Sequence, residues 1–370
     1  MQLNFEDIST LEKKFESAST LDDFFCLLND VIDLQNREEG THYKRFTEKK
    51  FKHYYSNLNK KYISFEIPKK TGGERKIDAP DRYLKKIQRR INLLLTLFFH
   101  PRKSAHGFVE KKSIVTNSEI HVGQRYLLNI DLKDFFPSVH FGRIHAVLQL
   151  RIFYNKAKTP NPEYKLTDKL FGLHPEIAKI IANFCCFNGK LPQGAPTSPI
   201  ITNIVSQRLD YKLVRLAKEN HYFYTRYADD ISFSSRKRGF NMSFMQSLES
   251  LIKEEGFDVN HKKTRVQKRT GRQMVTGITV NKKKNLSRDY IRKIRAMLNN
   301  WEKMGYKKAH ERFASFYPDE KGYIRNRSIP ELESVLRGKL MFMGMVRGND
   351  DQIFLKYQNQ FNKLSKKVFN

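Results

Sequence analysis

The chain has 370 residues and a formal net charge of +30, from 69 Lys and Arg against 39 Asp and Glu. This length allows a substantial core and two or three lobes. So large a positive excess, spread along the chain among 28 Phe and 17 Tyr, favours a nucleic-acid partner over a membrane surface. The longest apolar run, 93–99, is too short to cross a bilayer, and the first residues lack a secretory-signal pattern. The three cysteines form no disulfide or zinc pattern, so we expect a cytoplasmic protein without a membrane partner.

The first third of the chain predicts helices and one hairpin. Residues 1–45 are expected to be helical, with Ser19-Thr20 capping one helix. A β-type segment, 62–68, followed by a basic glycine-containing turn, 69–76, and a short return strand predicts a hairpin. The tip of that hairpin is either an exposed polar turn or a basic site that binds phosphate.

The rest of the chain mixes helices and strands, which indicates an α+β fold. A proline-rich loop, 191–199, interrupts the pattern with a stiff backbone. The expected strands are 126–132, a hairpin within 223–234, a turn and strand at 256–264, and 275–281. The expected helices are 82–99, 142–150, 175–187, 200–219, 242–255, 288–304, 330–346 and 351–368.

Acidic residues stand at the ends of two predicted strands. The strand 126–132 has a buried-type pattern yet contains Asp131, and burying that carboxylate without a partner would be costly. Aromatic and β-branched residues flank Asp229 and Asp230, which places this pair at the turn of a hairpin. Such a pair is most often a solvated turn. If the sheet brings Asp131 beside it, the three carboxylates could hold two Mg²⁺ ions about 3.5–4 Å apart for phosphoryl or nucleotidyl transfer.

Five segments resemble, in this order, the motifs of reverse transcriptases. Each match alone is weak, whereas the ordered set is specific and covers roughly residues 60–285. The segments are Ile67-Pro68-Lys69-Lys70 with Arg75, Asp131-Leu132-Lys133-Asp134-Phe135-Phe136, Leu191-Pro192-Gln193-Gly194, Tyr227-Ala228-Asp229-Asp230, and the turn at Lys263.

Two further elements resemble those of bacterial retron reverse transcriptases. Val275-Thr276-Gly277 is similar to a Val-Thr-Gly triplet of that lineage. The stretch from Asn117 to His121 is similar to its Asn-Ala-x-x-His element, with Ser118 where alanine is usual. Without the other motifs, the triplet would be interpreted as an ordinary strand ending in a turn.

The resemblance implies a catalytic metal site. Asp131, Asp229 and Asp230 would be the catalytic residues and metal ligands, assisted by the backbone carbonyl of Leu132. The site would hold two Mg²⁺ ions, with Mn²⁺ as an alternative.

The resemblance also implies a nucleotide pocket. Phe136 would lie under the sugar and exclude a 2′-hydroxyl; the alternative is a core position. Lys263 would either protonate the leaving pyrophosphate or bind phosphate as part of a basic tract. The residues expected to bind the nucleotide are Lys69, Arg75, Lys133, Asp134, Phe136, Gln193, Gly194 and Lys263.

A right-hand polymerase fold follows from the resemblance. We expect an N-terminal helical region (1–45), fingers and palm (46–285, with the palm mainly at 122–145 and 190–285) and a helical, RNA-binding thumb (286–370). The implied activity is RNA-directed DNA synthesis from dNTPs. The implied template is a cognate structured noncoding RNA, copied into multicopy single-stranded DNA (msDNA) from a guanosine 2′-hydroxyl.

The resemblance further implies antiphage defence with a separate effector protein. The alternatives are another defence- or CRISPR-associated reverse transcriptase, a non-catalytic RNA-binding scaffold with the same fold, and a primase or RNA polymerase with a similar palm. The intact three aspartates argue against the scaffold.

Overall fold

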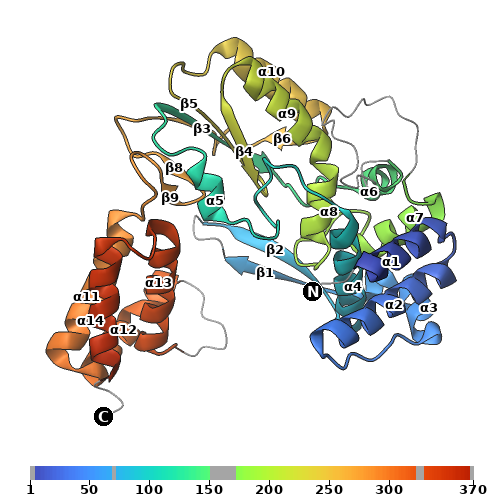
Figure 1. Ribbon diagram of the computed structural model, residues 1–370, viewed down its shortest axis with the longest axis horizontal. Coiled ribbons are helices and arrows are strands. Elements are labelled where there is room, and N and C mark those ends of the chain that lie inside the picture. Colours follow the sequence, from blue (N-terminus) through green and yellow to red (C-terminus); the bar gives the residue numbers. More distant parts are fainter. Residues whose placement is uncertain (1–4, 69–71, 151–171, 322–328, 367–370) are drawn as a thin grey trace.

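The computed structural model describes residues 5–68, 72–150, 172–321 and 329–366 (Figure 1). It confirms the α+β prediction, because an antiparallel sheet is packed with helices and a helical bundle follows it. Among these described residues, no helix is both long and apolar enough to cross a membrane.

The segment predicted to be helical, 1–45, contains the helices α1 and α2, and a third helix and a short 3₁₀ turn follow it. The helix α2 begins with a capping box, in which the Thr20 side chain accepts from the Asp23 backbone and the Asp23 side chain accepts from the Thr20 backbone. Gly40 ends this helix in the left-handed conformation that glycine adopts without strain. The elements are α1 (Phe5–Ser17), α2 (Leu21–Glu39), α3 (Glu48–Ser56) and η1 (Leu58–Lys61).

The predicted hairpin of the fingers is confirmed. The strands β1 (Tyr62–Pro68) and β2 (Glu74–Pro80) pair antiparallel, with Phe65 opposite Ile77. The helix α4 (Arg82–Phe98) follows directly, capped by the Asp81 side chain. The hairpin is largely exposed, so its hydrogen-bond ladder and not a core holds its shape.

A sheet of five strands forms the palm. Its central strand β3 (Tyr126–Lys133) is buried at most positions, because neighbouring strands flank it and helices cover it. The strand order is β4-β5-β3-β6, and β7 also pairs with β3. The partners are β4 (Phe223–Tyr227), β5 (Asp230–Ser235), β6 (Asp258–Val259) and β7 (Arg265–Lys268).

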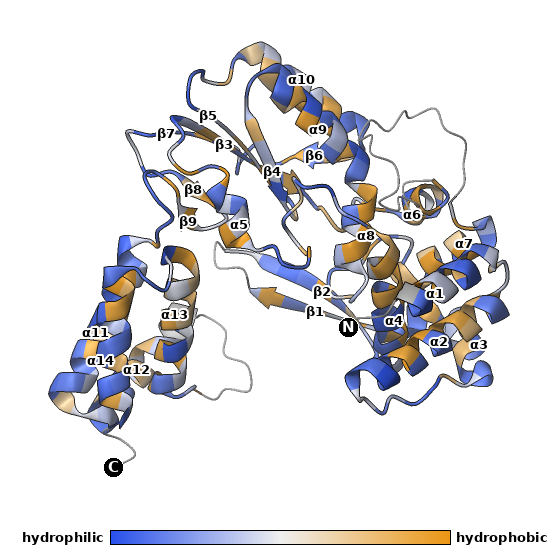
Figure 2. Ribbon diagram, viewed as in Figure 1, coloured by the Kyte–Doolittle hydropathy of each residue, from blue (hydrophilic) through white to orange (hydrophobic). Residues whose placement is uncertain are grey.

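Helices around the sheet build the larger core. In Figure 2, hydrophobic positions recur along α2, α4, α7 and α8, which pack on one another, while α9 and α10 pack against β4 and β6. The remaining helices are α5 (Ile114–Glu119), α6 (Phe141–Leu148), α7 (Pro175–Cys185), α8 (Ser198–Val205), α9 (Gln207–Glu219) and α10 (Met242–Glu254).

Two sequence predictions in the palm are wrong in detail. The single helix expected at 200–219 is two helices, α8 and α9, separated at Ser206; the Thr202 hydroxyl bonds back to earlier carbonyls, a contact that bends helices. The strand expected at 275–281 is a hairpin of β8 (Met274–Val275) and β9 (Ile278–Thr279). Both turn residues, Thr276 and Gly277, have positive φ, as a two-residue hairpin turn requires.

The thumb region is a bundle of four helices, at the lower left of Figure 1, and its buried side chains share a second core cluster with residues of α5, β3, β8 and β9. Its large buried side chains include Trp301, Leu336, Met343 and Phe361. The sequence predicted three of these helices and missed α12, which follows α11 after a turn at Gly305. The helices are α11 (Arg288–Met304), α12 (Tyr306–Lys321), α13 (Leu332–Arg347) and α14 (Gln352–Lys366).

Candidate active site

The three aspartates singled out in the sequence lie at one end of the palm sheet. Asp131 on β3 is directly opposite Asp230 on β5 in the antiparallel register. Asp229 occupies the adjacent turn, and its carbonyl accepts a hydrogen bond from the Leu132 backbone N–H at 3.0 Å. The β3–β5 ladder therefore brings together carboxylates that are far apart in the chain.

The β4–β5 hairpin has a two-residue turn. Tyr227 pairs with Asp230, which leaves only Ala228 and Asp229 between the strands, and Ala228 is buried with a φ of 54°. A Cβ at Gly107 would lie 2.3 Å from the Ala228 nitrogen, so only glycine allows the 105–108 loop to approach the turn this closely.

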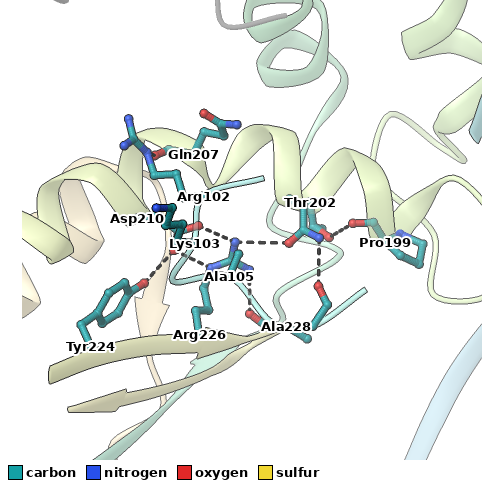
Figure 3. Close-up of polar contacts among 12 residues, drawn as sticks. Arg102, Lys103, Ala105, Pro199, Thr202, Gln207, Asp210, Tyr224, Arg226 and Ala228 are labelled. Atoms are coloured by element: carbon teal, nitrogen blue, oxygen red, sulfur yellow. Dashed lines mark hydrogen bonds and ion pairs between the residues drawn. The ribbon is translucent and has the colours of Figure 1, made fainter. Parts of the chain in front are cut away.

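A buried ion pair supports the same turn (Figure 3). Arg226 on β4 and Asp210 on α9 are 0% and 1% exposed, and their Nη2 and Oδ2 atoms are 2.7 Å apart. A second bond, from Arg226 Nε to Asp210 Oδ1 at 2.8 Å, makes the pair bidentate. Arg226 also donates to the Ala228 carbonyl at 3.1 Å, and Tyr224 donates to Asp210 at 2.7 Å.

The sequence analysis did not single out this pair. The only signal was Arg226 itself, a charged residue within an otherwise aromatic and β-branched strand. Burying a charge is costly unless it is paired, so such a residue implies an acidic partner. Nothing local to β4 indicates that the partner is on α9.

The carboxylates at the end of the sheet perturb one another. Desolvation, followed by the charges of Asp229 and Asp131, raises the pKa of Asp230 to about 6. Desolvation and the charge of Asp131 also raise the pKa of Asp229, while Lys263 and Arg75 oppose that shift. Asp230 is exposed, so water weakens these effects, but the direction shows that the cluster favours a proton or a cation.

Two side chains hold Asp131 from the other side. Lys263 Nζ lies 2.9 Å from Asp131 Oδ2, and this bond raises the pKa of the lysine. Asn260 donates from Nδ2 to Asp131 Oδ1 at 2.9 Å and from its backbone N–H to the Asp131 carbonyl at 2.8 Å. The sequence analysis named Lys263 but missed Asn260. An asparagine in a basic turn is common, so its residue type gave no indication of a contact with Asp131.

The donor chemistry fits a hard divalent cation. Among the described residues, no three His, Cys, Asp or Glu side chains already form a metal-binding group. Mg²⁺, however, usually takes one or two carboxylates and completes its shell with water and substrate phosphates. The carboxylates repel one another, and Asp131 already holds the ammonium of Lys263 as a cation, so these residues match what Mg²⁺ requires.

Among the residues expected to bind nucleotide, Arg75 lies near the acidic end, whereas Gln193 and Gly194 contact the fingers hairpin. Arg75 is exposed on β2 and close enough to Asp229 to lower its pKa. The Gln193 carbonyl accepts from the Asp78 backbone at 3.0 Å, which ties the 191–199 loop to the fingers hairpin. A Cβ at Gly194 would lie 2.8 Å from the Asp78 carbonyl oxygen. Lys69 lies outside the described residues.

The segment that follows Asp131 turns outward. Lys133 and Asp134 are exposed, and Asp134 has a φ of 46°, which turns the chain away from β3. Phe136 is half-buried, with ring centroids 5.8 Å from Phe135 and 6.2 Å from Phe108. It therefore has an exposed surface as well as contacts with other rings, and both interpretations of Phe136 remain predictions.

The residues that resembled the retron elements pack beside the β4–β5 hairpin. The ring nitrogens of His121, fully buried, lie 2.8 Å from the Thr225 hydroxyl on β4 and 2.7 Å from the Ser234 hydroxyl on β5. Desolvation lowers the pKa of His121 to about 3, so the ring is neutral. Asn117 Nδ2 lies 3.5 Å from the Thr276 hydroxyl, next to Gly277 and the buried Val275. The two elements are therefore one structural unit.

An antiparallel palm sheet with acids at one end, a fingers hairpin and a helical thumb define a polymerase of the right-hand type. Residues 67–280 match the family model described as reverse transcriptase (RNA-dependent DNA polymerase). The match covers more than half of the chain, which belongs to this family.

Relatives place the chain in the retron lineage. It is 42% identical over 243 residues to the retron Mx65 reverse transcriptase of Myxococcus xanthus, with 64% of this chain and 55% of that protein covered. It is 31% identical over 246 residues to the retron Ec86 reverse transcriptase of Escherichia coli, with 65% and 70% covered. The chain thus spans about half the length of the Mx65 relative.

A solved structure of telomerase from Candida albicans aligns over 94% of this chain and 76% of its own. The TM-score is 0.42 at 10% identity, which is too weak to carry an argument.

Proposed function

We propose that this chain is an RNA-directed DNA polymerase that joins dNTPs on an RNA template. The observation that carries the proposal is the direct pairing of Asp131 with Asp230, with Asp229 in the adjoining turn, in a chain of this family. The positive charge of the whole chain supports a nucleic-acid substrate.

The residues around the acids have complementary roles in the proposed reaction. Asp131, Asp229 and Asp230, with the Leu132 carbonyl, would hold two Mg²⁺ ions, or Mn²⁺ in their place. When bound, such ions lower the pKa of the attacking hydroxyl and neutralise charge on the leaving pyrophosphate. Arg75 would bind the triphosphate from the fingers hairpin.

The nucleotide would lie between the fingers and the palm. The backbone at Lys133 and Asp134 would cradle the triphosphate, and Phe136 would exclude the 2′-hydroxyl. Gln193 and Gly194 would line the pocket, since their loop is tied to the fingers hairpin. Lys263, which contacts Asp131 in this structure, would bind or protonate the pyrophosphate.

The similarity to retron reverse transcriptases supports a narrower proposal. The template would be a cognate structured noncoding RNA, primed from a guanosine 2′-hydroxyl and copied into msDNA. The thumb would bind this RNA, and a separate effector protein would complete an antiphage system. The three cysteines, all unpaired, suit the reducing cytoplasm in which we place this activity.

The test is DNA synthesis by the purified chain on an RNA template annealed to a DNA primer, with Mg²⁺ and dNTPs. We expect product from the wild type and none from an Asp229→Asn/Asp230→Asn variant. Asp258→Asn, which removes an exposed carboxylate on β6 near the site, should leave synthesis intact. Equal synthesis by the double variant would refute the assignment of the metal ligands.

The narrower proposal needs a separate measurement. Sequencing the nucleic acid that copurifies with the chain should recover one structured RNA joined to DNA through a 2′-linkage. Recovery of unrelated RNAs without attached DNA would leave the polymerase assignment standing and contradict the retron product.

A further inference from the structure

A basic hollow lies at the end of the palm sheet opposite the aspartates. Its volume is about 830 Å³, and four cationic side chains and one aromatic ring line it. The residues that define this basic hollow are Arg125, Tyr126, Arg236, Lys268 and Arg269.

The sheet itself builds the hollow from three distant segments. Tyr126, the first residue of β3, is paired with both Ser235 on β5 and Lys268 on β7. The Arg125 N–H donates to the Ser235 carbonyl, and the Arg269 N–H donates to the Arg125 carbonyl, each at 2.9 Å. The hollow therefore has a fixed backbone frame.

The hollow is separate from the catalytic end. Five residues of extended strand separate Tyr126 from Asp131, a distance of about 16 Å at roughly 3.3 Å per residue. A nucleotide bound at the aspartates would not reach the hollow. No proposed catalytic or nucleotide-binding residue lines it.

The charge of the hollow is uncompensated. No acidic residue lines it, and none of its four cations forms an ion pair with any described residue. The chain pairs its cations elsewhere: Arg208 and Lys212 share Glu255, and Lys283 contacts Asp351. Like charges gathered without counter-ions destabilise a fold, so their clustering on a fixed frame indicates an external anion.

Neighbouring loops extend the same charge. Lys237 and Arg238 follow Arg236 in the loop after β5, and Arg272 follows the β7 segment; all three are exposed. The basic surface is therefore wider than a single phosphate group. Its side chains are exposed and flexible, which suits contacts with successive phosphates of a polymer and gives little means of reading a base.

We propose that the basic hollow binds the phosphodiester backbone of a folded nucleic-acid segment that is not being copied. The proposal rests on the proposed function only in that this chain handles nucleic acid. An anchor at this end would hold the uncopied part of the template RNA, or the DNA already made, while the aspartates act on the primer end.

The test compares two variants that lose the same charge. The hollow variant carries Arg236→Gln, Lys268→Gln and Arg269→Gln. The control carries Lys49→Gln, Lys218→Gln and Lys253→Gln, at exposed positions away from the hollow that form no ion pair with a described residue.

Each full-length protein is first saturated with a short unlabelled RNA–DNA template–primer, so that the catalytic end is occupied. Binding of a labelled RNA hairpin, and of a DNA hairpin of the same sequence, is then measured by fluorescence anisotropy over a salt series. Extension of the template–primer is measured in parallel.

We expect the hollow variant to bind a hairpin on the order of 10- to 100-fold more weakly near 0.1 M salt, with a salt slope smaller by about 2.7 for three lost phosphate contacts. The control should change by about twofold or less, and extension by the hollow variant should match the wild type. The hairpin that loses more affinity identifies the bound strand as uncopied RNA or DNA product.

Three outcomes would overturn the inference: unchanged affinity and slope in the hollow variant, an equal loss in the control, or displacement of the hairpin by an equal concentration of inorganic phosphate. Failure of the wild type to extend the primer would instead contradict the proposed function, and hairpin binding would remain measurable.

Discussion

The two ends of the strand β3 carry opposite charge. Asp131 near its carboxyl end joins Asp229 and Asp230, whereas Tyr126 at its amino end borders four cations. At the acidic end the chain supplies a partial counter-charge, since Lys263 contacts Asp131. At the basic end no described residue does so. One sheet thus carries a site for cations at one end and a site for anions at the other. At each end, the excess charge indicates that the counter-ion comes from outside the protein.

The ends also differ in how rigidly they are held. Beneath the acidic end lie the buried Arg226–Asp210 pair and the His121 bridge between β4 and β5. The basic end consists of exposed cationic side chains at strand ends and in loops, and backbone hydrogen bonds fix the segments that carry them. Phosphoryl-transfer chemistry depends on precise geometry, whereas phosphate binding depends mainly on charge. We therefore expect substitutions at the two ends to fail in different ways.

The largest expected effect separates catalysis from binding. Asp229→Asn/Asp230→Asn should lower DNA synthesis by at least about 10³-fold, because the carboxylates that would hold the metal ions are lost. The affinity of this double variant for an RNA hairpin, and the salt slope of that binding, should stay unchanged. The hollow variant should instead lose hairpin affinity and keep DNA synthesis. Primer extension and anisotropy on the same preparations measure both. A fall in hairpin affinity equal to that of the hollow variant would show that the two ends are not separate sites.

The next effect concerns the buried Arg226–Asp210 pair that supports the acidic end. Asp210→Ala leaves the Arg226 charge buried without its partner, so we expect a loss of about 3–5 kcal/mol in the free energy of unfolding. Glu219→Ala on the same helix removes an exposed partner of Arg215 and should cost no more than about 0.5 kcal/mol. Chemical denaturation measures both. Equally small losses of unfolding free energy in both variants would mean that, without Asp210, Arg226 contacts solvent or another partner.

Phe136 tests whether shape as well as charge matters at the acidic end. If its ring excludes the 2′-hydroxyl, Phe136→Ala should raise the relative use of ribonucleotides by about tenfold or more. The melting temperature should change little, because the side chain is only half-buried. Competition between dNTPs and NTPs in primer extension measures the ratio. Lost stability with unchanged selectivity would favour the core interpretation.

The smallest effect is a pH dependence of stability in the presence of a chelator. The pKa of Asp230 is raised from 3.8 to about 6 in the folded chain, so the folded state holds this proton more tightly than the unfolded state. Stability should therefore fall as pH rises through this window and stay lower above it. Asp230→Asn removes that loss. Its melting temperature should exceed that of the wild type near neutral pH and converge with it near pH 4.

Mg²⁺ provides the control for this experiment. The ion should raise the melting temperature of the wild type at neutral pH, because it binds only the folded state, and have little effect on Asp230→Asn. A variant that is less stable than the wild type at neutral pH without metal would show that Asp230 makes a favourable contact in the folded chain.

Several elements could be predicted because their signals are local. The Thr20 cap, the fingers hairpin and the helix α4 follow from residue type and spacing, and the structure confirms them. The helix α12 was missed although Tyr306, Ala309 and Phe313 recur at helical spacing, and these residues pack in the thumb core. The β8–β9 hairpin was interpreted as one strand because Thr276 is not a residue expected at positive φ.

The sequence by itself determined the family, the α+β class and the identity of the three aspartates, because motif order, residue type and periodicity are properties of the chain. Tertiary structure alone decided which residues meet. The register of β3 with β5 places Asp131 opposite Asp230, and helix packing brings Asp210 into contact with Arg226. Three loops at the other end of the sheet gather cations that no local pattern connects. These residues are far apart in the sequence, so only the packing of the folded chain brings them together.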